Sequence, residues 1–274
     1  MIRFAARLAA LLGFAAVLAV LAAPAAAAEV SAARSSLRVF VSGASESGKS
    51  QALHQLFVSR LPRVISLDIN GEVAERSPQA ERTFGYADLC EALKTCARKG
   101  AQLGHRWHIA AYLEQDEIPR LFRTLAPPIN TENATSFTRA IGGIAIECGE
   151  ASWLAPNNRT PPEVRDAFHR GRHHQLSLLM ATQRPADVAR CVTAEARVLI
   201  AFRHHETLEL DWWAKRTSRA VADVIAELPQ YHSIYYVPAS GRVHVCDAAY
   251  RPLRVMDLRG NEVARAGPRL VRGA

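Results

Sequence analysis

One short segment near the start of the chain constrains its fold more than any other: an apolar run leads into a glycine-rich loop and then into a helix-forming stretch. The loop fits the pattern G-x-x-x-x-G-K-[ST], in which glycines let backbone N–H groups point at anionic oxygens and the following helix terminus adds partial positive charge. We expect Lys49 to reach the β- and γ-phosphates of a nucleotide and the Ser50 hydroxyl to hold Mg²⁺. A Gly/Ser-rich turn is the alternative, but the four matched positions favour a phosphate-binding loop. The loop consists of Gly43, Ala44, Ser45, Glu46, Ser47, Gly48, Lys49 and Ser50.

Apolar runs alternate with helical patterns along the rest of the chain. After a first strand at Leu37–Ser42, the unbroken apolar runs Ile141–Cys148 and Leu176–Thr182 are typical of the middle of a parallel sheet. The alternation predicts an α/β fold with a doubly wound, mainly parallel sheet, helices on both faces and the ligand at the carboxyl end of the first strand. One long helix is expected over Leu208–Leu228, and Arg242–Cys246 indicates the return strand of a small C-terminal β-hairpin.

The composition divides the chain into three segments. Residues 1–29 have the layout of a secretory signal, with two arginines before the uncharged stretch 8–28. One interpretation is that residues 8–28 lead to export or to association with a membrane. The other is that the first residue of the protein has been assigned too early, and that the protein lies in the cytoplasm or at the cytoplasmic face of the inner membrane. Residues 37–258 are expected to form the folded domain, and the Gly/Arg-rich residues 259–274 are expected to be a disordered basic tail.

The charge balance favours acidic partners. The chain of 274 residues has 34 Lys and Arg against 26 Asp and Glu, a net charge of +8, and such an excess favours nucleic acid among binding partners. The five cysteines form no C-x-x-C pair and have no metal-ligand spacing with histidine, which argues against a structural zinc site.

Three further segments stand out: Leu67–Glu72, Gly149–Asn157 and Arg172–Pro185, of which the most specific piece is the string Ala-Thr-Gln-Arg-Pro at 181–185. Together they resemble the FtsK/HerA superfamily of ring-shaped DNA-pumping P-loop ATPases. The resemblance implies a RecA-like (ASCE) P-loop ATPase domain at residues 37–258. It also implies ATP and Mg²⁺ as cofactors, a homo-oligomeric ring, and movement of DNA without regard to sequence.

The resemblance assigns three residues to catalysis. Hydrolysis needs a carboxylate that orients the attacking water and a cation that offsets charge on the γ-phosphoryl oxygens. Glu150 takes the first role, Arg172 the second from across a subunit boundary, and Gln183 takes the position of the γ-phosphate sensor. The alternatives are a solvated helix-cap glutamate, a surface arginine and a strand-end glutamine.

One departure from the family bears on hydrolysis. The family has Asp-Glu where this chain has Gly149-Glu150, and the missing aspartate would hold the Mg²⁺ shell. Glu147 could supply a metal ligand if the register shifts, although a carboxylate within an apolar strand needs a polar partner. Asp68 is a second candidate acid, or simply a turn residue.

Two other functions stay open. One is a membrane-associated phage-assembly or export ATPase resembling zonula-occludens-toxin-type proteins, and the other is a nucleotide-binding protein with weak or lost hydrolysis.

Overall fold

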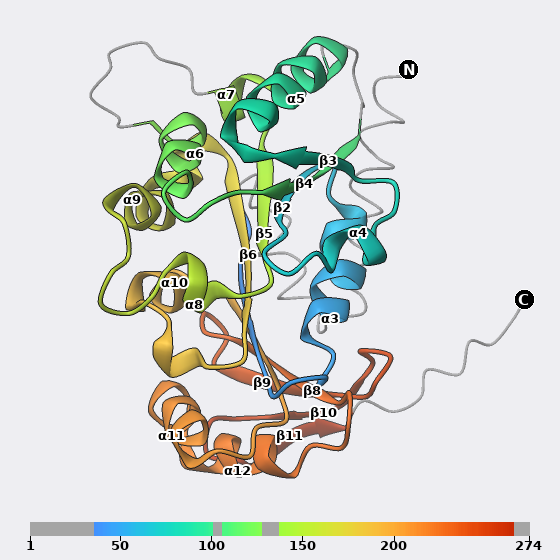
Figure 1. Cartoon of the computed structure of the whole chain (residues 1–274). Coiled ribbons are helices and arrows are strands. Elements are labelled where there is room, and N and C mark those ends of the chain that lie inside the picture. Colours follow the sequence, from blue (N-terminus) through green and yellow to red (C-terminus); the bar gives the residue numbers. More distant parts are fainter. Residues whose placement is uncertain (1–35, 101–105, 128–136, 266–274) are drawn as a thin grey trace, which may run out of the picture. The chain divides into compact units, whose positions relative to one another are not determined.

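The computed structural model describes residues 36–100, 106–127 and 137–265, and the chain divides into two compact units (Figure 1). The larger unit comprises Arg34–Ser42 and Gly48–Arg197, and the smaller one includes Gly43–Ser47 and the chain from Val198 onward. The signal-like residues 1–29 and the stretch 8–28 lie outside the described residues.

A parallel sheet forms the core of the larger unit. Its strands follow the order β1-β6-β5-β2-β4-β3, and every neighbouring pair is parallel. The predicted parallel α/β fold is therefore confirmed. The strands are β1 (Arg38–Ser42), β2 (Arg63–Leu67), β3 (Glu81–Phe84), β4 (Trp107–Tyr112), β5 (Ile144–Cys148) and β6 (Leu176–Thr182).

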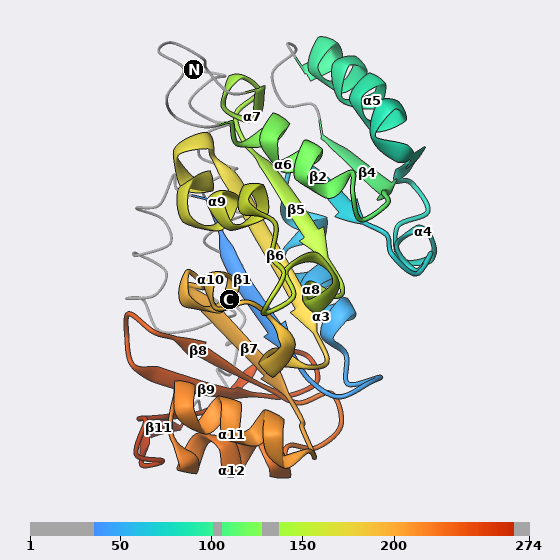
Figure 2. The ribbon, with the colours of Figure 1, turned by 60° about the vertical axis from the view of Figure 1, so that its left-hand side comes forward.

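Helices cover both faces of this sheet. Every residue of β5 is buried and nearly all of β6 is, as expected for strands with a layer on each side. Figures 1 and 2 show α3 and α4 on one face and α6, α9 and α10 on the other. The helical elements of this unit are α3 (Lys49–Leu56), η1 (Val58–Arg60), α4 (Val73–Arg76), α5 (Gly85–Gly100), α6 (Ile118–Leu125), α7 (Phe137–Ala140), α8 (Ala151–Leu154), α9 (Pro162–Arg170), η2 (Gly171–His174), η3 (Pro185–Asp187) and α10 (Arg190–Ala194).

The smaller unit is an antiparallel meander in which each strand pairs with the next. The expected hairpin is present as β8 and β9, but the sheet continues beyond it into two more strands. The expectation of a disordered tail from residue 259 is thus wrong for β11, and residues 266–274 lie outside the described residues. The elements are β7 (Val198–Phe202), α11 (Thr207–Arg216), α12 (Arg219–Glu227), β8 (Ser233–Val237), β9 (Arg242–Cys246), β10 (Pro252–Met256) and β11 (Glu262–Arg265).

The single helix expected over Leu208–Leu228 is wrong, because the chain forms α11 and α12 instead. Ser218 has an extended backbone, and its hydroxyl accepts a hydrogen bond from the Val221 N–H at 3.2 Å. A serine that caps an N-terminus in this way starts a new helix. Within the ranges that the structure describes, no helix is long and apolar enough to cross a membrane.

Candidate functional site

The first part of the phosphate loop belongs to the smaller unit, and backbone hydrogen bonds hold its conformation. The Ala44 N–H donates to the Arg203 carbonyl at 3.0 Å, and the Ser47 N–H donates to the Ala44 carbonyl at 3.4 Å. Glu46 has a left-handed backbone with φ 55°. Glycine is required at Gly43, because a Cβ there would lie 2.6 Å from both the Phe202 Cβ and the Ser47 Oγ.

A small cavity of about 110 Å³ lies beside this part of the loop. Residues 44–47 line it together with Arg203, His205, Gln230 and Tyr231. The lining holds the Arg203 guanidinium as well as the Glu46 carboxylate, and the guanidinium is the group that favours an anionic occupant. The sequence did not predict that Arg203 lies beside the phosphate loop; the available signal was its place directly after the apolar strand β7.

The second part of the loop starts helix α3 in the larger unit. Gly48 is the N-cap with φ 103°, a conformation that favours glycine, and its carbonyl accepts a hydrogen bond from the Ala52 N–H at 2.8 Å. Lys49 follows in the first turn and is only 7% exposed. Burial lowers the pKa of Lys49 to about 8, and the carboxylates of Glu150 and Glu72 partly offset this by raising it.

Glu150 is fixed at the carboxyl end of the parallel sheet. Its Oε1 accepts hydrogen bonds from the Thr182 hydroxyl at 2.7 Å and from the Ser152 hydroxyl at 2.6 Å. Strand β6, which ends at Thr182, lies between β5 and β1. The fold therefore brings Glu150 and Lys49, two of the predicted site residues, to one edge of the sheet.

The other two predicted catalytic residues lie at opposite ends of β6. Gln183 comes directly after β6, in a bend, and is exposed; the residue that contacts Glu150 is its neighbour Thr182. Arg172 is exposed in η2 at the amino end of β6. Because β6 has seven residues, at ~3.3 Å per residue it places Arg172 about 20 Å from the carboxyl end.

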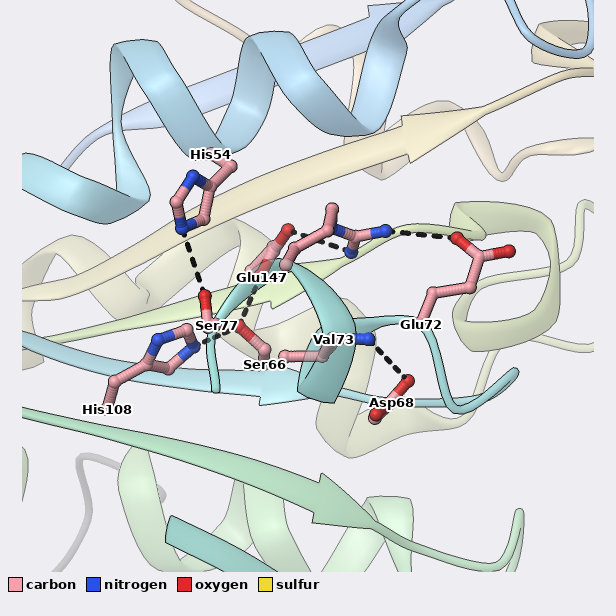
Figure 3. A network of polar contacts seen from close by, with 9 residues as sticks. His54, Ser66, Asp68, Glu72, Val73, Ser77, His108 and Glu147 are labelled. Carbon is pink, nitrogen blue, oxygen red and sulfur yellow. Dashed lines mark hydrogen bonds and ion pairs between the residues drawn. The ribbon is translucent and has the colours of Figure 1, made fainter. Parts of the chain in front are cut away.

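Glu147, the candidate metal ligand, lies in an internal polar network (Figure 3). Its carboxylate accepts a hydrogen bond from the Ser66 hydroxyl and lies 3.8 Å from an Arg76 nitrogen. These contacts supply the polar partner that a carboxylate in an apolar strand requires. Burial raises the pKa of Glu147, with Ser66 and Arg76 acting in the opposite direction.

Comparison with known structures agrees with this fold. The genome-packaging NTPase B204 from Sulfolobus turreted icosahedral virus 2, in complex with ATP-gammaS, is 22% identical over 77% of this chain and 96% of its own, with a TM-score of 0.60. B204, the DNA-packaging ATPase from Sulfolobus turreted icosahedral virus, is 20% identical over 76% of this chain and 95% of its own, with a TM-score of 0.57. The N-terminal domain of zonular occludens toxin from Neisseria meningitidis matches less well, at 12% identity over 63% of this chain and 80% of its own, with a TM-score of 0.35.

No model of a known protein family matches the sequence, and no curated protein is similar enough to match. The structural likeness nonetheless defines the class of fold: this chain has the P-loop NTPase fold, in the form shared by the B204 packaging proteins. This is the fold that the resemblance to FtsK/HerA ATPases implied.

Proposed function

We propose that this chain binds ATP with Mg²⁺ at Gly43–Ser50 and is an FtsK/HerA-type ATPase that couples hydrolysis to the movement of DNA. The observation that carries the proposal is that the buried Lys49, in the first turn of α3, and Glu150 lie at the same edge of a parallel sheet. This edge is where open α/β sheets bind their ligands.

The residues of the loop fit a nucleotide phosphate. The Ser47 hydroxyl is buried and has no hydrogen-bond partner among the described residues, so a ligand oxygen would satisfy it. Lys49 would hold the β- and γ-phosphates, and Ser50 would hold Mg²⁺, which when bound neutralises charge that develops on the phosphates. Because its burial disfavours the ammonium form, Lys49 gains more from an anionic ligand than an exposed lysine would.

Glu150 is suited to orient an attacking water. The Thr182 and Ser152 hydroxyls both donate to its Oε1. Its Oε2 is therefore the oxygen that would accept a hydrogen bond from the water. A carboxylate held in this way needs little reorganisation during the reaction. We assign Gln183, exposed at the end of β6, to sensing the γ-phosphate, and Arg172 to contacting a nucleotide bound by a neighbouring subunit of a ring.

The DNA part of the proposal rests on charge and on the structural neighbours. The net charge is +8, and B204 is described as a DNA-packaging ATPase. Contacts to phosphates by arginine carry no sequence information, so we expect binding to DNA of any sequence and a steep dependence on salt.

Measuring ATP turnover with and without double-stranded DNA tests the proposal. The wild type should turn over ATP faster than Lys49→Ala and faster still with DNA, while Glu150→Gln should bind ATP but not hydrolyse it. If the wild type is no faster than Lys49→Ala, the motor function is wrong. Binding of ATP without turnover would then support the alternative of a nucleotide-binding protein, which the glycine at Gly149 favours.

A further inference from the structure

Arg76 links an exposed carboxylate to a buried one (Figure 3). Its Nη1 lies 3.0 Å from the Glu72 Oε2, and its Nη2 lies 3.8 Å from the Glu147 Oε1. The Glu72 side chain is 57% exposed and that of Glu147 only 3%. One guanidinium thus bridges the protein interior and its surface.

The buried end of this bridge is held firmly. Glu147 on β5 and Ser66 on β2 are direct partners in the parallel ladder, and the Ser66 hydroxyl donates to the Glu147 carboxylate. The His108 Nε2 on β4 lies 2.7 Å from the same hydroxyl. The Ser66 hydrogen bond thus fixes Glu147, and the 3.8 Å contact attracts Arg76 to it by charge rather than by a hydrogen bond.

The exposed end of the bridge is aimed at the phosphate-loop edge. Figure 3 shows Glu72 on the side to which the arrow of β2 points, which is the carboxyl end of the sheet. The turn that presents it is fixed, because Gly71 has φ 78° and the Asp68 Oδ1 accepts a hydrogen bond from the Val73 N–H at 3.1 Å. Asp68 takes part in this turn through Oδ1, and its role as a candidate acid stays a prediction. The carboxylates of Glu150 and Glu72 are the two whose charge raises the pKa of the buried Lys49.

The resemblance to FtsK/HerA ATPases implies an aspartate at position 149, where this chain has glycine. A Cβ built on Gly149 meets nothing within 4 Å, so no side chain fills this position. We propose that Glu72 supplies the missing carboxylate, facing the Mg²⁺ of the bound nucleotide or a water of that ion, and that Arg76, anchored by Glu147, positions it. This inference rests on the nucleotide site proposed above.

The two carboxylate oxygens of Glu72 have different roles. Arg76 donates to the Glu72 Oε2, which leaves Oε1 as the oxygen for the metal or its water. Carboxylate oxygens are preferred ligands of Mg²⁺. Partners that orient such a group, as Arg76 does here, typically change metal affinity by about 10–100-fold when they are removed.

Titration of a fluorescent ATP analogue, in Mg²⁺ and in EDTA, tests the assignment without relying on turnover. We expect Glu72→Gln to bind the analogue about tenfold more weakly than the wild type in Mg²⁺, and equally well in EDTA. Glu75→Gln is the matched control, because Glu75 is exposed on the same helix α4, and it should bind like the wild type under both conditions.

A rescue experiment separates a metal role from a structural one. Adding Gly149→Asp to Glu72→Gln should restore the tighter binding in Mg²⁺, which a merely structural role of Glu72 would not allow. If Glu72→Gln binds like the wild type in Mg²⁺, or if Gly149→Asp does not restore binding, the inference is overturned and the nucleotide site stands. If the wild type binds no more tightly than Lys49→Ala, the nucleotide site and the inference both fail.

Discussion

Lys49 allows a quantitative test of its burial, because a buried ammonium group makes the free energy of unfolding depend on pH. Burial lowers its pKa from the ordinary value of 10.5 to about 8. At about 1.4 kcal/mol for each pKa unit, this difference corresponds to roughly 3 kcal/mol. Because only 7% of the residue is exposed, screening by solvent removes little of this cost.

The sign of the pH dependence follows from the two pKa values. Below pH 8, Lys49 is charged in both the folded and the unfolded state, and the folded state bears the full cost of burying the charge. Between pH 8 and 10.5 the folded protein has released the proton and the unfolded chain retains it, so this contribution to the free energy of unfolding rises with pH. Lys49→Met should therefore raise the free energy of unfolding by up to roughly 3 kcal/mol at pH 7, and the gain should shrink toward pH 10.

The assay is urea unfolding of the nucleotide-free chain, followed by tryptophan fluorescence at several pH values from 7 to 10. Lys99→Met is the control, because Lys99 is exposed near the end of α5, and it should change stability little at any pH. The reasoning is refuted if Lys49→Met is no more stable than the wild type at pH 7, or if its advantage is the same at pH 7 and pH 10.

Three further substitutions test single contacts. Thr182→Val should lower ATP turnover about tenfold, since it removes a hydrogen bond that holds Glu150. Thr182→Ser should retain activity, and equal turnover in both variants would contradict this role. Gly43→Ala should destabilise the protein by about 1–3 kcal/mol in urea unfolding, because its Cβ would lie 2.6 Å from that of Phe202; an unchanged midpoint would show that the loop relaxes freely. Ser218→Ala should cost about 1 kcal/mol by loss of the α12 cap, and Ser218→Asp should retain most of the stability; a loss of stability in both variants would point to a cause other than the cap.

The parallel sheet and the phosphate loop could be predicted because both depend on local patterns. The apolar run Ile141–Cys148 contains the fully buried strand β5, as a central strand of a parallel sheet requires, and the loop pattern predicts a strand before it and a helix after it. Contacts between distant segments were harder to predict. The contact of Thr182 is an example: β6 ends at this residue, and its hydroxyl donates to Glu150, 32 residues earlier in the chain. The role of Gln183, which follows it and is exposed, stays a prediction.

Other features depended on side-chain partners that are far apart in the sequence. Glu147 looked like a metal candidate because an acid in an apolar strand needs a partner, yet that partner is Ser66, 81 residues away. The break at Ser218 was missed because the apolar spacing continues across it, and only the cap hydrogen bond ends one helix and starts the next. The final strands were missed because β10 is mostly half-buried, β11 is largely exposed, and both lack a clear apolar alternation.

Helix α3 joins the phosphate loop to the polar network at its other end. Lys49 lies in its first turn and His54 in its last, and the His54 Nε2 lies 3.0 Å from the Ser77 hydroxyl at the end of α4 (Figure 3). A short helix moves as a rigid unit. A ligand that attracts Lys49 should therefore also shift the His54 imidazole at the other end of the helix. His54 is therefore a built-in spectroscopic probe: its ring resonances in NMR should move when nucleotide is added, and those of the exposed His169 should not.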